Sequence, residues 1–137
     1  MEKQLNEYLS DMFLLTVKVK KYHWNIEDKN FFGLHKFFEE IYSDLDEAID
    51  EVAERIRMIG KYPLSTLKDY ITNATIEECT KDHDRKSMLK ELLADHEKII
   101  SNLKKYVYNA EDPGTEDLFV QRLRVHEKYK WMIESHL

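Results

Sequence analysis

The sequence predicts an all-α protein: a four-helix bundle in which a long crossover joins the second helix to the third. The chain of 137 residues has only 3 glycines and 2 prolines, so few positions interrupt a helix. Apolar residues also recur every three or four positions, which is the pattern of amphipathic helices that share a core. The length fits one domain over residues 1–137 with a modest hydrophobic core.

The first predicted helix covers residues 1–24. Its expected core-facing positions are Leu5, Leu9, Met12, Phe13, Thr16 and Val19. Lys18, Lys20 and Lys21 form a cationic cluster near its end. Because charge clusters usually lie on solvated helix faces, we expect these three lysines to be exposed.

The second predicted helix covers residues 31–59, a stretch without proline and with Gly33 as its only glycine. Its apolar stripe consists of Leu34, Phe38, Ile41, Leu45, Ile49, Val52, Ile56 and Ile59. Tyr62 and Pro63 end this helix, since proline cannot donate a backbone hydrogen bond.

The connection that follows has about twenty residues, which is long for a compact bundle. We expect it to cross the bundle from end to end, with a short helix over residues 64–71. The third helix is predicted to begin near Asp84, and the fourth after the turn at residues 111–115, with Thr115 as its N-cap. Their expected inward positions are Met88, Leu92, Ile99, Leu103 and Tyr106, then Leu118, Leu123, Tyr129 and Met132.

The second helix also carries a polar sector, about 150° around the helix axis from its apolar stripe. This sector contains His35, Glu39, Ser43, Asp46, Asp50 and Glu54. His35 with Glu39, and Asp50 with Glu54, are one helical turn apart, so the side chains of each pair lie one above the other. Imidazole and carboxylate ligands together suit iron, manganese or zinc.

A single copy of this helix cannot hold one metal ion with both pairs. His35 and Asp50 are fifteen residues apart, about 22 Å along a straight helix, whereas metal–ligand bonds span about 2 Å. Two antiparallel copies related by a two-fold axis would bring Asp50 and Glu54 of one chain to His35 of its partner. His23 would join His35 if residues 25–30 form a helix–helix turn.

These residues lie in a stretch that resembles the Dps family of mini-ferritins. The resemblance is carried by KKYHWNI, FFGLHKFFEEIY and DEAIDEVAERI, and it extends to VHEKYKWMI in the fourth helix. It implies a ferritin-like bundle and an iron-oxidising (ferroxidase) centre whose histidines and carboxylates come from two subunits. The metal ligands that it implies are His23, His35, Glu39, Asp50 and Glu54, of which His23, His35, Asp50 and Glu54 would be catalytic.

The resemblance further implies a homo-oligomer, a hollow dodecamer built from two-fold dimers, that stores ferric mineral. Fe(II) would be oxidised to Fe(III) by hydrogen peroxide or oxygen. The acidic pairs Glu111–Asp112 and Glu116–Asp117 resemble the stretch that lines the family's three-fold pores. An ordinary solvated turn is an equal alternative for these four residues.

The other four histidines, His83, His96, His126 and His136, are expected to be structural or surface residues with their hydrogen bonds satisfied. His96 and His126 each stand in a His-Glu-Lys tripeptide, but neither has the second histidine four residues later that a helical zinc-protease motif needs. No histidine follows a glutamate by three positions, so a di-iron site inside one bundle is not expected.

The formal net charge of −6 opposes binding to nucleic acid and to anionic membranes. A DNA-compacting protein, as some members of the family are, is therefore the disfavoured alternative, and we expect no lysine-rich tail. A signalling or adhesion role stays open. The chain has one cysteine, no apolar run of transmembrane length and no signal peptide, which predicts a cytoplasmic protein without a membrane partner.

Overall fold

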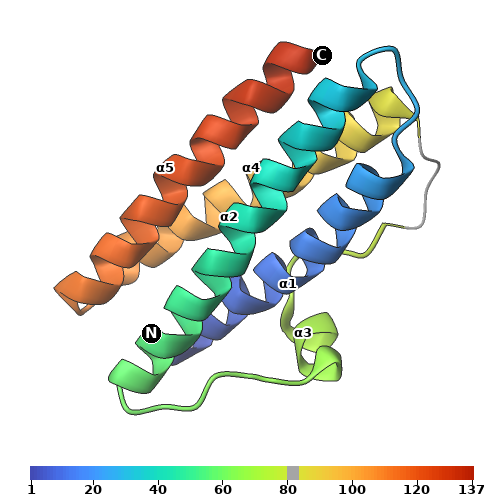
Figure 1. Ribbon diagram of the computed structural model, residues 1–137. Coiled ribbons are helices and arrows are strands. Elements are labelled where there is room, and N and C mark those ends of the chain that lie inside the picture. The colour runs from blue at the N-terminus through green and yellow to red at the C-terminus, as the bar shows by residue number, and fades with distance from the viewer. Residues whose placement is uncertain (80–83) are drawn as a thin grey trace.

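The computed structural model describes residues 1–79 and 84–137, and over these residues it contains five helices and no strand. The helices are α1 (Glu2–Asn25), α2 (Phe31–Met58), α3 (Leu67–Asn73), α4 (Arg85–Asn109) and α5 (Pro113–His136). Four long helices form a bundle, and the short α3 lies outside it (Figure 1). The predicted all-α bundle with a crossover between its second and third long helices is confirmed.

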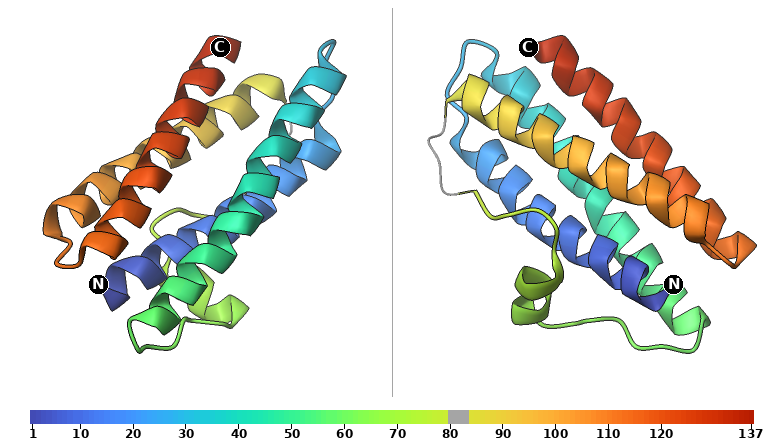
Figure 2. Two further views of the ribbon diagram at one scale, coloured as in Figure 1. Left: turned by 60° about the vertical axis from the view of Figure 1, so that its left-hand side comes forward. Right: turned by 180° about the vertical axis from the view of Figure 1, so that it is seen from behind.

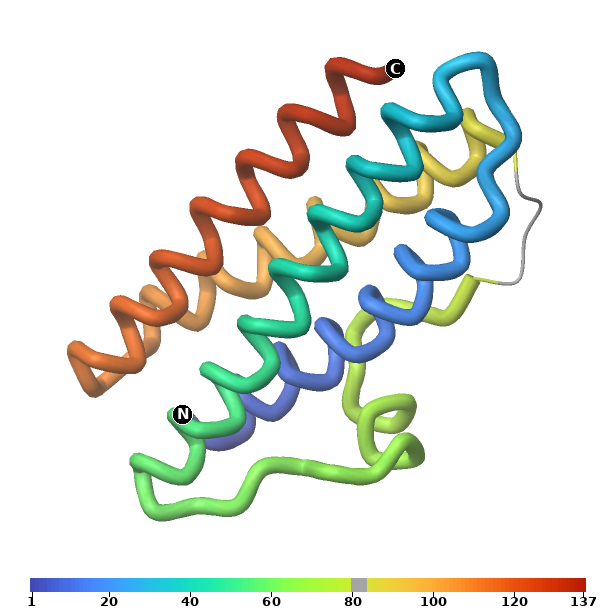
Figure 3. Tube along the Cα trace, in the orientation of Figure 1, coloured from blue at the N-terminus to red at the C-terminus, as the bar shows by residue number. Residues whose placement is uncertain are grey.

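The bundle consists of two antiparallel helix pairs, α1 with α2 and α4 with α5 (Figure 2). The crossover leaves the end of α2 and travels the length of the bundle before α4 begins (Figure 3). Because it returns to the other end, α2 and α4 run in the same direction. This is the topology of bundles with one long crossover connection.

The apolar stripe of α2 faces the core, as its periodicity predicts. Ile49 and Ile59 are partly buried, and the fully buried members are Leu34, Phe38, Ile41, Leu45, Val52 and Ile56. The polar sector of the same helix faces away from the core, where His35 and Glu39 are half-buried and the later members are exposed. The helix therefore presents its candidate ligands outward.

The crossover is fastened to α1 at two places. The ring of Tyr70, in α3, stacks on Phe13 with the ring centroids 3.9 Å apart. Farther along, the buried carboxylate of Asp11 accepts hydrogen bonds from the backbone N–H of Thr75 at 2.5 Å and from the Thr75 hydroxyl at 2.8 Å. The short helix begins at Leu67, three residues later than expected, because the Thr66 side chain caps it.

The predicted N-cap of the last helix is wrong. Asp112 is the N-cap of α5, and its carboxylate accepts a hydrogen bond from the Thr115 backbone N–H at 2.8 Å. Pro113 takes the first helical position, where a missing N–H leaves no hydrogen bond unmade. The Asp112 carboxylate also pairs with Arg55 of α2, and Thr115 is buried. These contacts favour a structural role for Asp112 over the pore-lining one.

The lysine cluster of α1 is not a solvated face. Lys18 is only 3% exposed, and its ammonium group contacts Asp95 at 2.7 Å and Glu91 at 3.3 Å, both on α4. Lys20 lies over the ring of Tyr42 at 5.2 Å from the centroid. Pairing with two carboxylates is what lets Lys18 remain inside the bundle.

No helix among the described residues is long and apolar enough to cross a membrane.

Candidate metal centre

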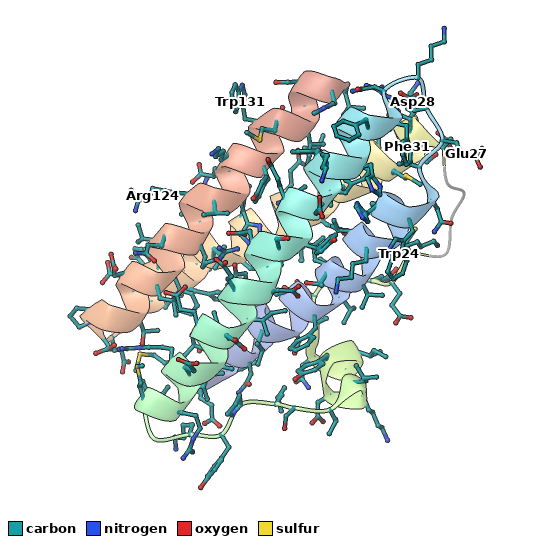
Figure 4. The ribbon with its side chains drawn as sticks, in the orientation of Figure 1. Trp24, Glu27, Asp28, Phe31, Arg124 and Trp131 are labelled. Carbon is teal, nitrogen blue, oxygen red and sulfur yellow. The ribbon has the colours of Figure 1, made fainter. Side chains whose placement is uncertain are left out.

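The turn between α1 and α2 brings His23 and His35 together. α1 ends at Asn25 and α2 begins at Phe31, so five residues separate them, and Asp28 accepts a hydrogen bond from the Asn30 backbone N–H at 2.9 Å. Figure 4 shows Trp24 and Phe31 on the two sides of this turn. Two histidines twelve residues apart in the chain thus become neighbours at one end of the bundle, as the turn hypothesis predicts.

The two imidazoles are held by reciprocal hydrogen bonds. Nδ1 of His23 lies 2.7 Å from the carbonyl oxygen of His35, and Nδ1 of His35 lies 2.7 Å from the carbonyl oxygen of His23. The rings stack with centroids 3.6 Å apart and planes inclined by 14°. Since a carbonyl oxygen can only accept, each Nδ1 carries the proton. In its neutral form each ring therefore presents Nε2 with a free lone pair, the state in which histidine binds metals.

Aromatic side chains pack around this pair. Tyr42 contacts the His23 ring edge-on with centroids 5.3 Å apart, and Phe31 stacks on His35 at 4.9 Å. His23 is buried and His35 is half-buried. The rings are thus fixed from several sides before any metal arrives, which lowers the entropy cost of ligation.

Glu39 lies one helical turn beyond His35 on the same face of α2. Its carboxylate accepts a hydrogen bond from Lys36 at 3.0 Å. This hydrogen bond and the charge of Lys36 lower the pKa of Glu39. Glu39 is therefore an anionic oxygen donor beside the histidine pair, with an exchangeable ammonium partner.

Asp50 and Glu54 do not join this cluster within one chain. They are exposed on the outward face of α2, about 22 Å (Asp50) and about 28 Å (Glu54) along the helix from His35. Among the described residues no three histidine, cysteine or acidic side chains gather to hold a metal ion. One chain thus carries two separated groups of candidate ligands on a single face of α2, a histidine group and a carboxylate group, which we call candidate half-sites.

Of the remaining histidines, His126 and His136 have the hydrogen bonds expected of structural residues. Nδ1 of His136 bonds to the Met132 carbonyl oxygen at 2.8 Å, and His126 is paired through both ring nitrogens. His96 differs from the expectation: its Nδ1 is paired, but its fully buried Nε2 has no partner among the described residues. His83 lies outside the described residues.

The buried polar chain of hydrogen bonds that contains His96 and His126 was not predicted from the sequence. It links Asp44, Arg122, Tyr8, His126 and His96 across the centre of the bundle. The available signal was positional, since His96 stands four residues after Leu92 and three before Ile99, on the inward stripe of α4. A polar residue at an inward position predicts a buried hydrogen-bond network.

Four long helices joined by one long crossover, with histidine and carboxylate half-sites along the second helix, define a ferritin-like bundle. A family model described as "Ferritin-like domain" matches residues 2–137. A protein of Bacillus anthracis named "DNA protection during starvation protein 2" is 34% identical over 136 residues, covering 97% of this chain and 93% of the relative.

Solved structures agree with this relationship. Dps from Staphylococcus aureus superposes with a TM-score of 0.95 at 32% identity, covering 98% of this chain and 93% of that one. The Vibrio cholerae DPS protein, described as a member of a broad superfamily of ferritin-like diiron-carboxylate proteins, gives 0.91 at 33% identity, covering 96% and 85%. The chain therefore belongs to the Dps family of ferritin-like proteins.

Proposed function

We propose that this protein oxidises Fe(II) at a site shared by two subunits and stores the ferric product inside a hollow oligomer. Membership of the family supports the general role, iron storage and protection against oxidants. The observation that carries the more specific proposal is the hydrogen-bonded histidine pair, whose Nε2 atoms are free to bind a metal. It supplies two donors, and a stable iron site needs more.

The missing donors are Asp50 and Glu54 of a second copy. Both carboxylates lie on the same outward face of α2 as His35. If two α2 helices pack antiparallel about a two-fold axis, the carboxylate half of each chain meets the histidine half of the other, and two identical sites form. Glu39 supplies a further oxygen beside each histidine pair once it releases Lys36.

The chemistry follows from the donor types. Neutral imidazole nitrogens bind Fe(II), whereas anionic carboxylate oxygens favour Fe(III) and so make its oxidation easier. Two Fe(II) ions supply two electrons which, with two protons, reduce one hydrogen peroxide molecule to two water molecules, so no hydroxyl radical forms. Oxygen is the second candidate oxidant. The ferric product would collect as mineral inside a dodecamer, the assembly that we propose for storage.

The sharpest test of a shared site is complementation between two inactive variants. His35→Ala alone and Asp50→Ala alone damage both sites of their own dimer, so each should oxidise Fe(II) slowly after peroxide is added. When the two variants are co-expressed, a mixed dimer has one site with both mutations and one intact site. Random pairing would then restore about a quarter of the native sites.

Glu51→Ala is the matched control, because Glu51 is an exposed carboxylate of α2 outside the polar sector. It should keep the native rate of ferric absorbance, with assembly size checked by gel filtration. If the co-expressed variants stay as slow as the single ones while assembling normally, the site is not shared. If the single variants oxidise Fe(II) at the native rate, these residues have no role in the chemistry.

DNA binding is the second candidate function, because the Bacillus anthracis relative is named for DNA protection. The net charge of −6 opposes it, since affinity for DNA comes largely from cations placed against phosphates. We therefore expect no shift of duplex DNA in a gel at physiological salt. A shift that weakens steeply with added salt would favour the DNA-binding function instead.

A further inference from the structure

The centre of the bundle holds a polar chain to which the proposed iron chemistry assigns no role. Arg122 of α5 pairs with Asp44 of α2 through two hydrogen bonds, of 2.8 and 3.1 Å, and donates from Nε to the Tyr8 hydroxyl at 2.8 Å. The Tyr8 oxygen lies 2.8 Å from Nε2 of His126, and Nδ1 of His126 lies 3.1 Å from Nδ1 of His96. Each of the four long helices contributes at least one residue.

The direction of these hydrogen bonds follows from what each group can donate. The guanidinium of Arg122 only donates, so Tyr8 accepts from it and points its own O–H at His126 Nε2. A neutral imidazole has a single N–H, which His126 then carries on Nδ1 and donates to Nδ1 of His96. One proton is thus shared between two ring nitrogens, and His96 keeps its own on Nε2.

The surroundings offer no place for a second proton. Both imidazoles are 0% exposed. The groups that face them are Tyr8 of α1, Arg122 and Tyr129 of α5 and, behind Arg122, Asp44 of α2. No carboxylate in residues 1–79 or 84–137 bonds to either ring, and the cation whose charge acts on both rings is Arg122.

We propose that the His96–His126 pair is an acid-sensitive contact that loosens the bundle when it is protonated. An added proton would place two N–H groups against each other at 3.1 Å and leave a buried cation beside Arg122. The α4–α5 pairing and the Tyr8 contact from α1 would then separate to admit water. The proposed acid sensitivity does not depend on iron binding, because the His96–His126 pair lies in the core and not at the candidate metal ligands.

The pKa values of the two buried histidines also indicate that protonation destabilises the fold. Burial and then the charge of Arg122 lower the pKa of His96 to about 3, and burial, with the neighbouring ring, lowers the pKa of His126 well below its usual 6.5. Because unfolded histidines titrate near 6.5, the unfolded chain takes up protons that the folded chain refuses. The pair's contribution to stability is therefore complete above pH 6.5 and is lost as the pH falls below it.

The test is the pH dependence of urea unfolding between pH 5 and 6, at fixed concentration of the whole protein. Binding of two protons by the unfolded chain alone raises the unfolding equilibrium constant by about sixtyfold as the pH falls from 6 to 5. His96→Gln and His126→Gln should each reduce that dependence by about eightfold, whatever they do to stability at pH 7. His136→Gln, a half-buried histidine of the same α5, should keep the native dependence.

A second measurement covers the case in which a variant does not fold. In the native protein, the imidazole proton resonances of His96 and His126 should not titrate between pH 7 and 5 while the fold persists. Amide hydrogen exchange in α4 and α5, corrected for its intrinsic pH dependence, should accelerate over the same range. Titration of either ring near pH 6.5, or an unchanged pH dependence in folded Gln variants, would overturn the proposal.

Discussion

Removing the hydroxyl of Tyr8 measures how much the buried polar chain contributes to the free energy of unfolding. Tyr8→Phe keeps the ring in a site that is 1% exposed but removes the group that joins Arg122 to His126. Each buried polar group left without its partner costs about 1–3 kcal/mol. Tyr8→Phe leaves two such groups, Nε of Arg122 and Nε2 of His126. Because the variant also no longer buries a hydroxyl, part of this cost is offset, and we expect the free energy of unfolding to fall by about 2–4 kcal/mol.

Tyr22→Phe is the matched control. Tyr22 is also fully buried, but its hydroxyl has no hydrogen-bond partner among the described residues. The same atom is therefore deleted from the same kind of environment, where it lies near the Cys79 thiol and the Glu91 carboxylate but forms no hydrogen bond among the described residues. We expect its effect to be neutral or stabilising, because an unsatisfied polar atom disappears.

Urea unfolding followed by far-ultraviolet circular dichroism at pH 7 measures both variants, at equal protein concentration because association adds to stability. For a chain of this size the loss in Tyr8→Phe corresponds to a fall in Tm of about 6–16 °C. The reasoning is refuted if the free energy of unfolding of Tyr8→Phe lies within about 0.5 kcal/mol of the native value, because a change that small is typical of a surface substitution. It is equally refuted if Tyr22→Phe destabilises as much as Tyr8→Phe.

Three further outcomes are expected. Asp112→Ala removes the N-cap of α5 and should lower the free energy of unfolding by about 1 kcal/mol, against little change for the exposed Glu116→Ala, both by urea unfolding. Leu45→Ala opens a cavity under α2 and should cost about 2–5 kcal/mol in the same assay; a loss below 1 kcal/mol would mean that the core refills it. Zinc at a hundredfold excess over its Kd should stabilise the native protein by about 2.7 kcal/mol in thermal unfolding and leave His35→Ala/Asp50→Ala unchanged.

The parts of this molecule that follow a short-range pattern could be predicted from the sequence. The stripe of α2 repeats every three or four residues, so its buried face and its opposite polar face follow from helix geometry alone. The meeting of His23 with His35 required only a helix–helix turn between them. The relative position of two residues on either side of one short turn depends only on the neighbouring sequence, so it can be predicted.

The parts that depend on several helices meeting could not be predicted in this way. Lys18 reads as a surface lysine until α4 brings Asp95 within 2.7 Å. Thr115 is a good capping residue, but Asp112 also finds Arg55 of α2, a partner that no pattern within α5 reveals. The tautomers of the His96–His126 pair depend on Tyr8, more than a hundred residues away along the chain.

The reciprocal hydrogen bonds of His23 and His35 give these residues a structural role at the helix end in addition to the proposed role at the metal. The carbonyl group of His23 belongs to the last turn of α1, where carbonyl oxygens have no backbone N–H donor within the helix. Nδ1–H of His35 supplies that donor. Nδ1 of His35 caps the end of α1, while Nε2 remains available to the proposed metal ion. If the proposed iron site were lost in evolution, both rings would still be needed for the hydrogen bonds between α1 and α2, so the histidine pair should persist longer than Asp50 and Glu54.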